Sequence, residues 1–235
     1  MSRKRRSPAW RAAASPVAAA VLAPTAGAAL FAAARSTADI GAQGEASWFL
    51  GGAAALSFAH LAGAAFRPLY VFAHELTHAL AAWAGGGKVY AFVVKGDSGR
   101  VDLSHAGPFV ALAPYWVPLY ALACAGAYRV WLWYGAPPWS RQAFLAAMGA
   151  ALAFHLLHTA RSLWQTHQSD LDEAGPALSL ALIALLNSAV LLAALKCLFP
   201  DRVSLGAAFA AVSAATAAFW GGAAALVRAA LAAAA

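Results

Sequence analysis

Most of the chain consists of apolar runs that are long enough to cross a lipid bilayer. A helix needs about 20 consecutive apolar residues to span the hydrocarbon core of a membrane. Of the 235 residues, 63% are hydrophobic and only 11% are charged, which is unlike a soluble domain. Such runs cover residues 48–66, 68–85, 108–133, 141–164, 176–198 and 205–226, and a weaker run that Pro24 interrupts covers residues 17–34. We therefore predict an all-α polytopic membrane protein with six or seven transmembrane helices.

The amino-terminal segment differs from the rest of the chain. Residues 1–47 combine a basic start, the weak apolar run and a polar linker, and we separate them from a transmembrane domain at 48–235. The net charge of +7 gathers at the amino terminus and at helix ends, so we expect the lipid bilayer as its partner and no nucleic acid. Cys124 and Cys197 lack C-x-x-C spacing, so neither a disulfide nor a cysteine metal site is expected.

One short segment has the alternation of strands instead of the period of a helix. In residues 88–103, β-branched and aromatic residues flank a turn at Gly96-Asp97-Ser98-Gly99. Two such runs around a glycine-containing turn are typical of a β-hairpin. We therefore predict a small hairpin directly after the apolar run at 68–85.

The run at 68–85 contains an H-E-x-x-H motif, formed by His74, Glu75 and His78. Two histidines at i and i+4 lie on one face of a helix, so both imidazoles can reach one zinc ion. The glutamate between them can take a proton from a nearby water molecule. A carboxylate inside an apolar helix costs about 3 kcal/mol or more to insert into a membrane. A structural polar cluster is the alternative, but the cost of Glu75 favours a water-activating metal site.

A catalytic zinc site needs a third protein ligand besides the two histidines. The densest set of other donors lies in residues 155–173 and comprises His155, His158, His167, Asp170, Asp172 and Glu173. His155 and His158 lie one turn apart within an apolar run. This placement favours a polar pair, or groups that support the metal ligands from behind, over direct metal ligands. Asp172 and Glu173 precede Gly175-Pro176 and fit acids in the first turn of a helix. Asp170 is less easily explained in that way.

Asn187 is a lone amide within the run at 176–198. It could hydrogen-bond the backbone of a substrate or a developing oxyanion. A contact between two helices is an equally good explanation.

The residues described above resemble the zinc-dependent intramembrane metalloproteases of the site-2 protease type. The resemblance covers roughly residues 66–200 and rests on FAHELTHALAAW, on the glycines and hairpin that follow, on Gly107-Pro108 and Ala113-Pro114-Tyr115, and on Gln168-Ser169-Asp170-Leu171. It implies that His74, His78 and a distant aspartate, here Asp170, bind Zn²⁺ and that Glu75 is the general base. The aspartate stands in a Q-S-D-L context, whereas better-known members carry L-D-G or N-P-D-G. The resemblance also implies a location in the bacterial inner (plasma) membrane.

The resemblance and the motif together predict an intramembrane zinc endopeptidase that cleaves membrane protein substrates. The alternative is a non-catalytic metal-binding membrane protein, such as a transporter, a scaffold or an inactive homologue. Neither the substrate nor an oligomeric state is predicted.

The third zinc ligand remains open between Asp170 and His158. A carboxylate would offset part of the metal charge in a low-dielectric surround, and an imidazole would not. However, His158 lies at nearly the same depth in the membrane as the motif histidines. Asp170 reaches these histidines only if the chain folds back after residue 164. Charge and resemblance favour Asp170, and depth favours His158. His155, Asp172 and Asn187 remain candidates for alternative ligands or for groups behind the ligands.

Overall fold

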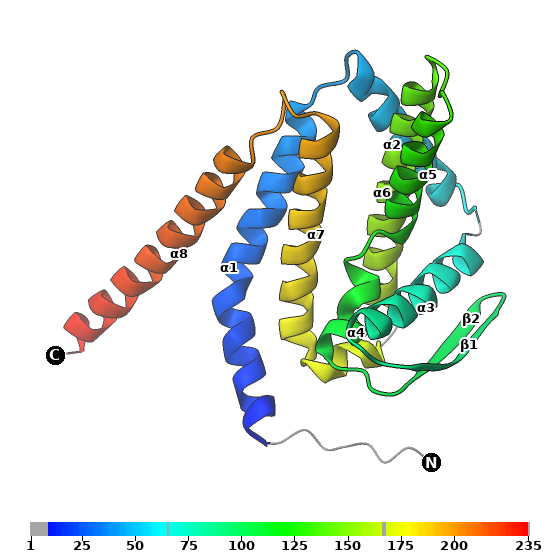
Figure 1. Cartoon of the computed structure of the whole chain (residues 1–235). Coiled ribbons are helices and arrows are strands. Elements are labelled where there is room, and N and C mark those ends of the chain that lie inside the picture. Colours follow the sequence, from blue (N-terminus) through cyan, green and yellow to red (C-terminus); the bar gives the residue numbers. More distant parts are fainter. Residues whose placement is uncertain (1–8, 65, 166–167, 235) are drawn as a thin grey trace. The chain divides into compact units, whose positions relative to one another are not determined.

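The computed structural model describes residues 9–64, 66–165 and 168–234, and most of them are helical (Figure 1). His167 and the basic residues 3–6 lie outside the described part. The chain divides into two units, one formed by residues up to 40 together with those from 174, and the other by residues 41–173.

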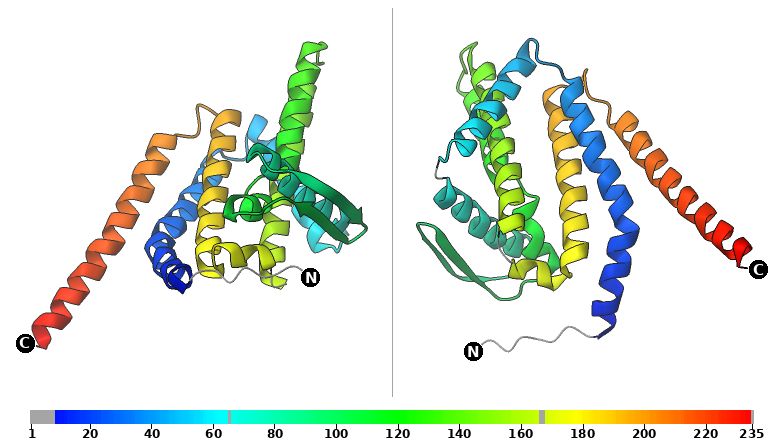
Figure 2. Two further views of the ribbon diagram at one scale, coloured as in Figure 1. Left: turned by 60° about the horizontal axis from the view of Figure 1, so that its bottom comes forward. Right: turned by 180° about the vertical axis from the view of Figure 1, so that it is seen from behind.

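The first unit consists of three helices. They are α1 (Ala9–Asp39), α7 (Pro176–Leu198) and α8 (Leu205–Ala233). Helix α1 lies alongside α7 (Figures 1 and 2), and small residues such as Ala29 and Ala33 are buried in this unit. Helix α1 continues through Pro24, so the run at 17–34 forms one long helix. Hence this weak run is compatible with a membrane span.

The second unit contains a close pair of helices, α2 (Glu45–Leu61) and α6 (Ser140–Gln165). Two glycines allow this approach: a Cβ atom at Gly52 would collide with the carbonyl of Ala146, and one at Gly149 with the carbonyl of Phe49. Near one end of the pair, the guanidinium of Arg141 binds both carboxylate oxygens of Glu45, at 2.5 and 2.7 Å. Helix α5 (Leu119–Trp133) also packs against α6.

The H-E-x-x-H motif lies on α3 (Arg67–Ala84), which begins at Arg67-Pro68 and ends before Gly85. Proline is favoured in the first turn of a helix, because its missing N–H has no partner there anyway. Strands β1 (Val89–Lys95) and β2 (Ser98–Leu103) follow and pair in an antiparallel hairpin. Its turn uses Gly96 at φ +55°, a backbone conformation that favours glycine. The predicted hairpin is confirmed, and it packs beside α3 (Figure 2).

The expected span at 108–133 is broken. Its first part forms α4 (Pro108–Leu112) and a 3₁₀ turn, η1 (Ala113–Tyr115), and its second part forms α5 at an angle of 73° to the first. Pro114 and Pro118 lie at the break, and proline removes the N–H group that would continue a helix. A second 3₁₀ turn, η2 (Ser169–Glu173), packs against α4.

The structure has fewer membrane-spanning helices than the six or seven predicted. Among the described residues, four helices are long and apolar enough to cross a membrane: Ser15–Asp39, Ser140–Trp164, Pro176–Leu198 and Leu205–Ala233. The bent pair of α4–η1 and α5 makes five if it counts as one span. The expected span at 48–66 is only a 17-residue helix ending at Leu61, and polar side chains interrupt the apolar surface of α3. The finding supports an integral membrane protein with a smaller number of crossings.

Candidate metal centre

Helix α3 places the two histidines of the motif on one face, where they meet Asp170 from η2. The ring centroids of His74 and His78 are 4.8 Å apart. Asp170 Oδ2 lies 3.4 Å from His74 Nε2 and 3.5 Å from His78 Nε2. One ligand atom from each residue lies within 4.8 Å of the other two. Zinc–ligand bonds of about 2.1 Å in a tetrahedral site separate neighbouring ligand atoms by about 3.4 Å, so two nitrogens and one oxygen at these distances fit a zinc ion.

The outer nitrogens of both imidazoles have partners. His78 Nδ1 lies 2.9 Å from the carbonyl oxygen of Val110. A carbonyl only accepts hydrogen bonds, so Nδ1 donates to it and Nε2 is the nitrogen that faces Asp170. Loss of the Nε2 proton would leave its lone pair free for a metal ion. His74 Nδ1 lies 3.4 Å from the hydroxyl of Tyr70, one turn earlier on α3. Such partners are typical of metal-binding histidines, because they fix both the tautomer and the ring orientation.

Asp170 reaches the histidines because the chain folds back after α6. Leu171 is buried. The fully buried Tyr115 shares its one hydroxyl proton between Asp170 Oδ2 and Gln168 Oε1, each 3.0 Å from the hydroxyl oxygen. Burial alone would raise the pKa of the Asp170 carboxyl. The hydrogen bonds from His74 and His78 outweigh it and hold this pKa well below its usual range. Asp170 is thus a carboxylate, the form that binds a metal.

Glu75 lies between the two histidines in sequence and faces the hairpin. A Cβ atom at Gly99 of β2 would approach Glu75 Cγ to 2.6 Å, so only glycine lets the strand come this close. The hairpin therefore packs against the side chain of the candidate general base.

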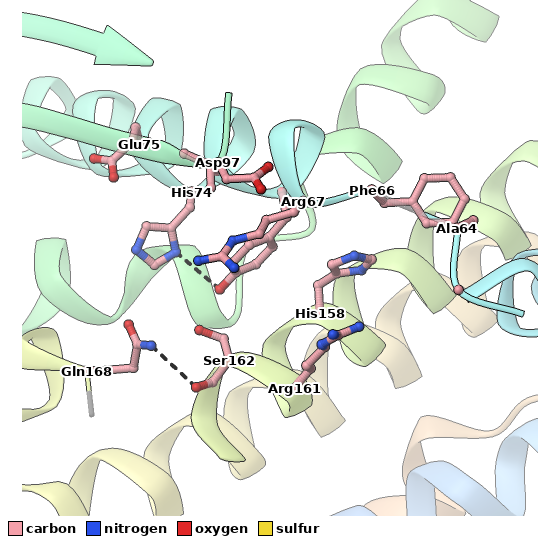
Figure 3. A pocket seen from close by; sticks show the side chains of 13 residues that line it. Ala64, Phe66, Arg67, His74, Glu75, Asp97, His158, Arg161, Ser162 and Gln168 are labelled. Atoms are coloured by element: carbon pink, nitrogen blue, oxygen red, sulfur yellow. Dashed lines mark hydrogen bonds between the residues drawn. The ribbon is translucent and has the colours of Figure 1, made fainter. Parts of the chain in front are cut away.

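A cavity of about 510 Å³ opens beside these residues (Figure 3). Its wall includes His74 and Glu75 from α3, Asp97 from the hairpin turn, and His158 from α6. The cavity is within the size range of small-molecule and peptide pockets. It gives an occupant access to the imidazole of His74 and the carboxylate of Glu75.

The structure does not bring the remaining candidates into the cluster. His158 is buried with its ring stacked on Phe154, at a centroid distance of 4.2 Å, and its Nδ1 lies 3.0 Å from the carbonyl oxygen of Phe154. Its ring also stacks on Tyr70 at 5.5 Å, so it lies behind a partner of His74. His155 lines a separate, much smaller cavity. Neither histidine belongs to the group of donors formed by the motif and Asp170.

Asp172 is not a member of the donor group. Asp172 is exposed on η2. Asn187 belongs to the first unit, where its amide donates to the carbonyl of Ile183 at 2.8 Å. Within the described residues, Asp170 is the donor that joins the motif histidines.

The sequence indicated no role for Tyr115, Gln168 or Tyr70. Ala113-Pro114-Tyr115 and Gln168-Ser169-Asp170 belong to the motifs of the resemblance, which assigns a role to Asp170 alone among them. A tyrosine directly after a proline break and a glutamine two residues before an acid are weak signals. Their link becomes visible only when η1 and η2 pack together.

Comparison of the chain with models of protein families, with curated proteins and with solved structures finds no match. The resemblance to site-2 proteases therefore stays a prediction.

Proposed function

We propose that the protein is a zinc-dependent intramembrane endopeptidase that cleaves membrane protein substrates. The observation that carries this proposal is the convergence of His74, His78 and Asp170 beside Glu75. Two imidazoles and one carboxylate are a common ligand set of zinc hydrolases, which leave a position open for water. Four or five helices that can cross a membrane support a substrate that is itself in or near the bilayer.

The side chains of the chain have distinct roles in this proposal. His74, His78 and Asp170 would hold the zinc ion. When bound, zinc polarises a carbonyl group and makes water a better nucleophile at neutral pH. Glu75 takes the proton of the attacking water and passes it to the leaving amine. The hairpin packs against the Glu75 side chain at Gly99 and restricts its movement.

The deciding experiment measures zinc content and cleavage together. Protein purified without chelator should carry one zinc per chain and should cut a single-span membrane protein in proteoliposomes. Glu75→Gln should keep the zinc and lower cleavage at least about 100-fold, because general-base catalysis contributes at least that much. Glu173→Gln is the matched control, since Glu173 is exposed on η2 and does not line the cavity.

Two outcomes would reject the proposal. Protein without a stoichiometric transition metal would remove its basis. Full zinc content with the same cleavage or cellular function in Glu75→Gln would favour a non-catalytic metal-binding membrane protein, such as a transporter or scaffold.

A further inference from the structure

The cavity beside the metal centre carries charged side chains that the proposed reaction does not use. Arg67 comes from the first turn of α3, and Arg161 comes from the last turns of α6 (Figure 3). Both line the same cavity as His74 and Glu75. Two arginines from different helices therefore line one cavity that adjoins the donor cluster. A planar guanidinium is well suited to bind a carboxylate, because it presents parallel N–H donors to both oxygens.

The rest of the lining mixes apolar side chains, such as Phe66 and Val71, with polar ones. Tyr70, Ser162 and Gln168 add hydroxyl and amide groups to the wall. A pocket for acyl chains would instead be lined by hydrophobic side chains. The composition of the wall thus fits a peptide segment with a polar or charged side chain better than the tails of a lipid.

Asp97 is the one acidic group that the hairpin contributes to the cavity wall. It lies at the turn between β1 and β2, on a different element from either arginine. Its charge opposes the binding of an anion. Removing this charge should therefore strengthen binding, whereas removing an arginine charge should weaken it.

We propose that this cavity binds an acidic side chain of the substrate polypeptide close to the bond that is cut, with Arg67 and Arg161 as its partners. This inference rests on the proposed peptidase function, which makes the occupant of the cavity a substrate. It adds a substrate class: membrane proteins with a glutamate or aspartate near the cleavage position.

The test measures binding without cleavage. The probes are capped, alanine-rich dodecapeptides with a neutral fluorescent label and one central residue, either Glu, Gln or Lys. They are titrated by fluorescence anisotropy against zinc-supplemented Glu75→Gln protein in dodecyl maltoside micelles, which carry no charge. The Glu peptide should bind about five- to tenfold more tightly than the Gln peptide, and the Lys peptide should bind most weakly. The preference should shrink as salt concentration rises.

Substitutions in the Glu75→Gln background assign this preference to residues. Arg67→Gln and Arg161→Gln should each reduce the preference for Glu to about twofold or less, and Asp97→Asn should increase it. Arg129→Gln is the matched control, because Arg129 lies over the ring of Trp133, outside the cavity. It should leave the preference unchanged.

Several results would overturn the proposal. Equal binding of the Glu and Gln peptides would do so, as would a preference that survives the loss of both arginines. Phosphatidylglycerol added to the micelles provides a further test. If it displaced the Glu peptide only when both arginines were present, the site would hold a lipid headgroup and the proposal would be rejected. Failure of the peptidase function gives a different pattern. If the protein neither held zinc nor cleaved a substrate, a preference for Glu that depends on the arginines would still support the anion site.

Discussion

Two helices of the second unit each carry a pair of histidines about one turn apart, but their surroundings differ. On α3, the Nε2 atoms of His74 and His78 both lie within 3.5 Å of Asp170 Oδ2. On α6, His158 stacks on Phe154 and its Nδ1 faces a carbonyl of its own helix. No described acid forms a donor group with His155 and His158. Spacing on a helix therefore brings two imidazoles together, but a metal site also needs a third donor and hydrogen bonds to the outer nitrogens of the rings.

The largest expected effect is a difference in zinc content between variants of the two histidine pairs. His78→Ala should lower the metal content from one zinc per chain to below about 0.1, because two remaining donors do not retain the ion through purification. His158→Ala should keep the full zinc content. Metal analysis by mass spectrometry on purified protein measures both.

Circular dichroism and size-exclusion chromatography provide the folding control for these two variants. Both should elute as the wild-type protein does. Zinc retained by folded His78→Ala would refute the site on α3. Zinc lost by folded His158→Ala would show that α6 supplies a ligand.

A smaller effect is expected at Tyr115, which distinguishes the α3 site by holding its third donor. Tyr115→Phe removes the hydroxyl that donates to Asp170 Oδ2 at 3.0 Å and leaves the buried ring in place. Loss of a partner behind a metal ligand weakens metal binding by about 10- to 100-fold. Competition with a zinc chelator should show a dissociation constant raised by this factor.

Tyr120→Phe is the matched control for this experiment. Its hydroxyl donates to the carbonyl of Leu69 at 2.8 Å and does not contact the cluster. The dissociation constant for zinc should therefore change by less than about threefold, since the lost hydrogen bond lies outside the site. Equal effects of the two variants would mean that Tyr115 does not position Asp170.

The sequence predicted the parts of the centre that depend on local spacing. The i, i+4 rule places His74 and His78 on one face without any knowledge of the fold. Similarly, the hairpin follows from strand alternation around Gly96 and Asp97. These features are set within about 30 residues of chain.

The sequence could not decide what depends on contacts between distant segments. Asp170 is 92 residues from His78 along the chain, and its position depends on the packing of η2 against α4 and on the hydroxyl of Tyr115. The number of spans was overestimated for a related reason. Hydropathy alone did not show that α2 ends at Leu61 or that the chain bends by 73° before α5.

The smallest expected effect concerns His158 itself. His158→Leu replaces a buried imidazole among aromatic rings with an apolar side chain of similar size. The carbonyl of Phe154 loses one partner, but it can keep the bond within its own helix, so the free energy of unfolding should change by about 1 kcal/mol or less. The zinc dissociation constant should change by less than about twofold, because the ring of His158 stacks on Tyr70, which in turn contacts His74. Thermal unfolding and chelator competition measure the two quantities. A dissociation constant raised tenfold, with stability unchanged, would mean that this stacking orients Tyr70 on His74 Nδ1 and that the two histidine pairs are coupled.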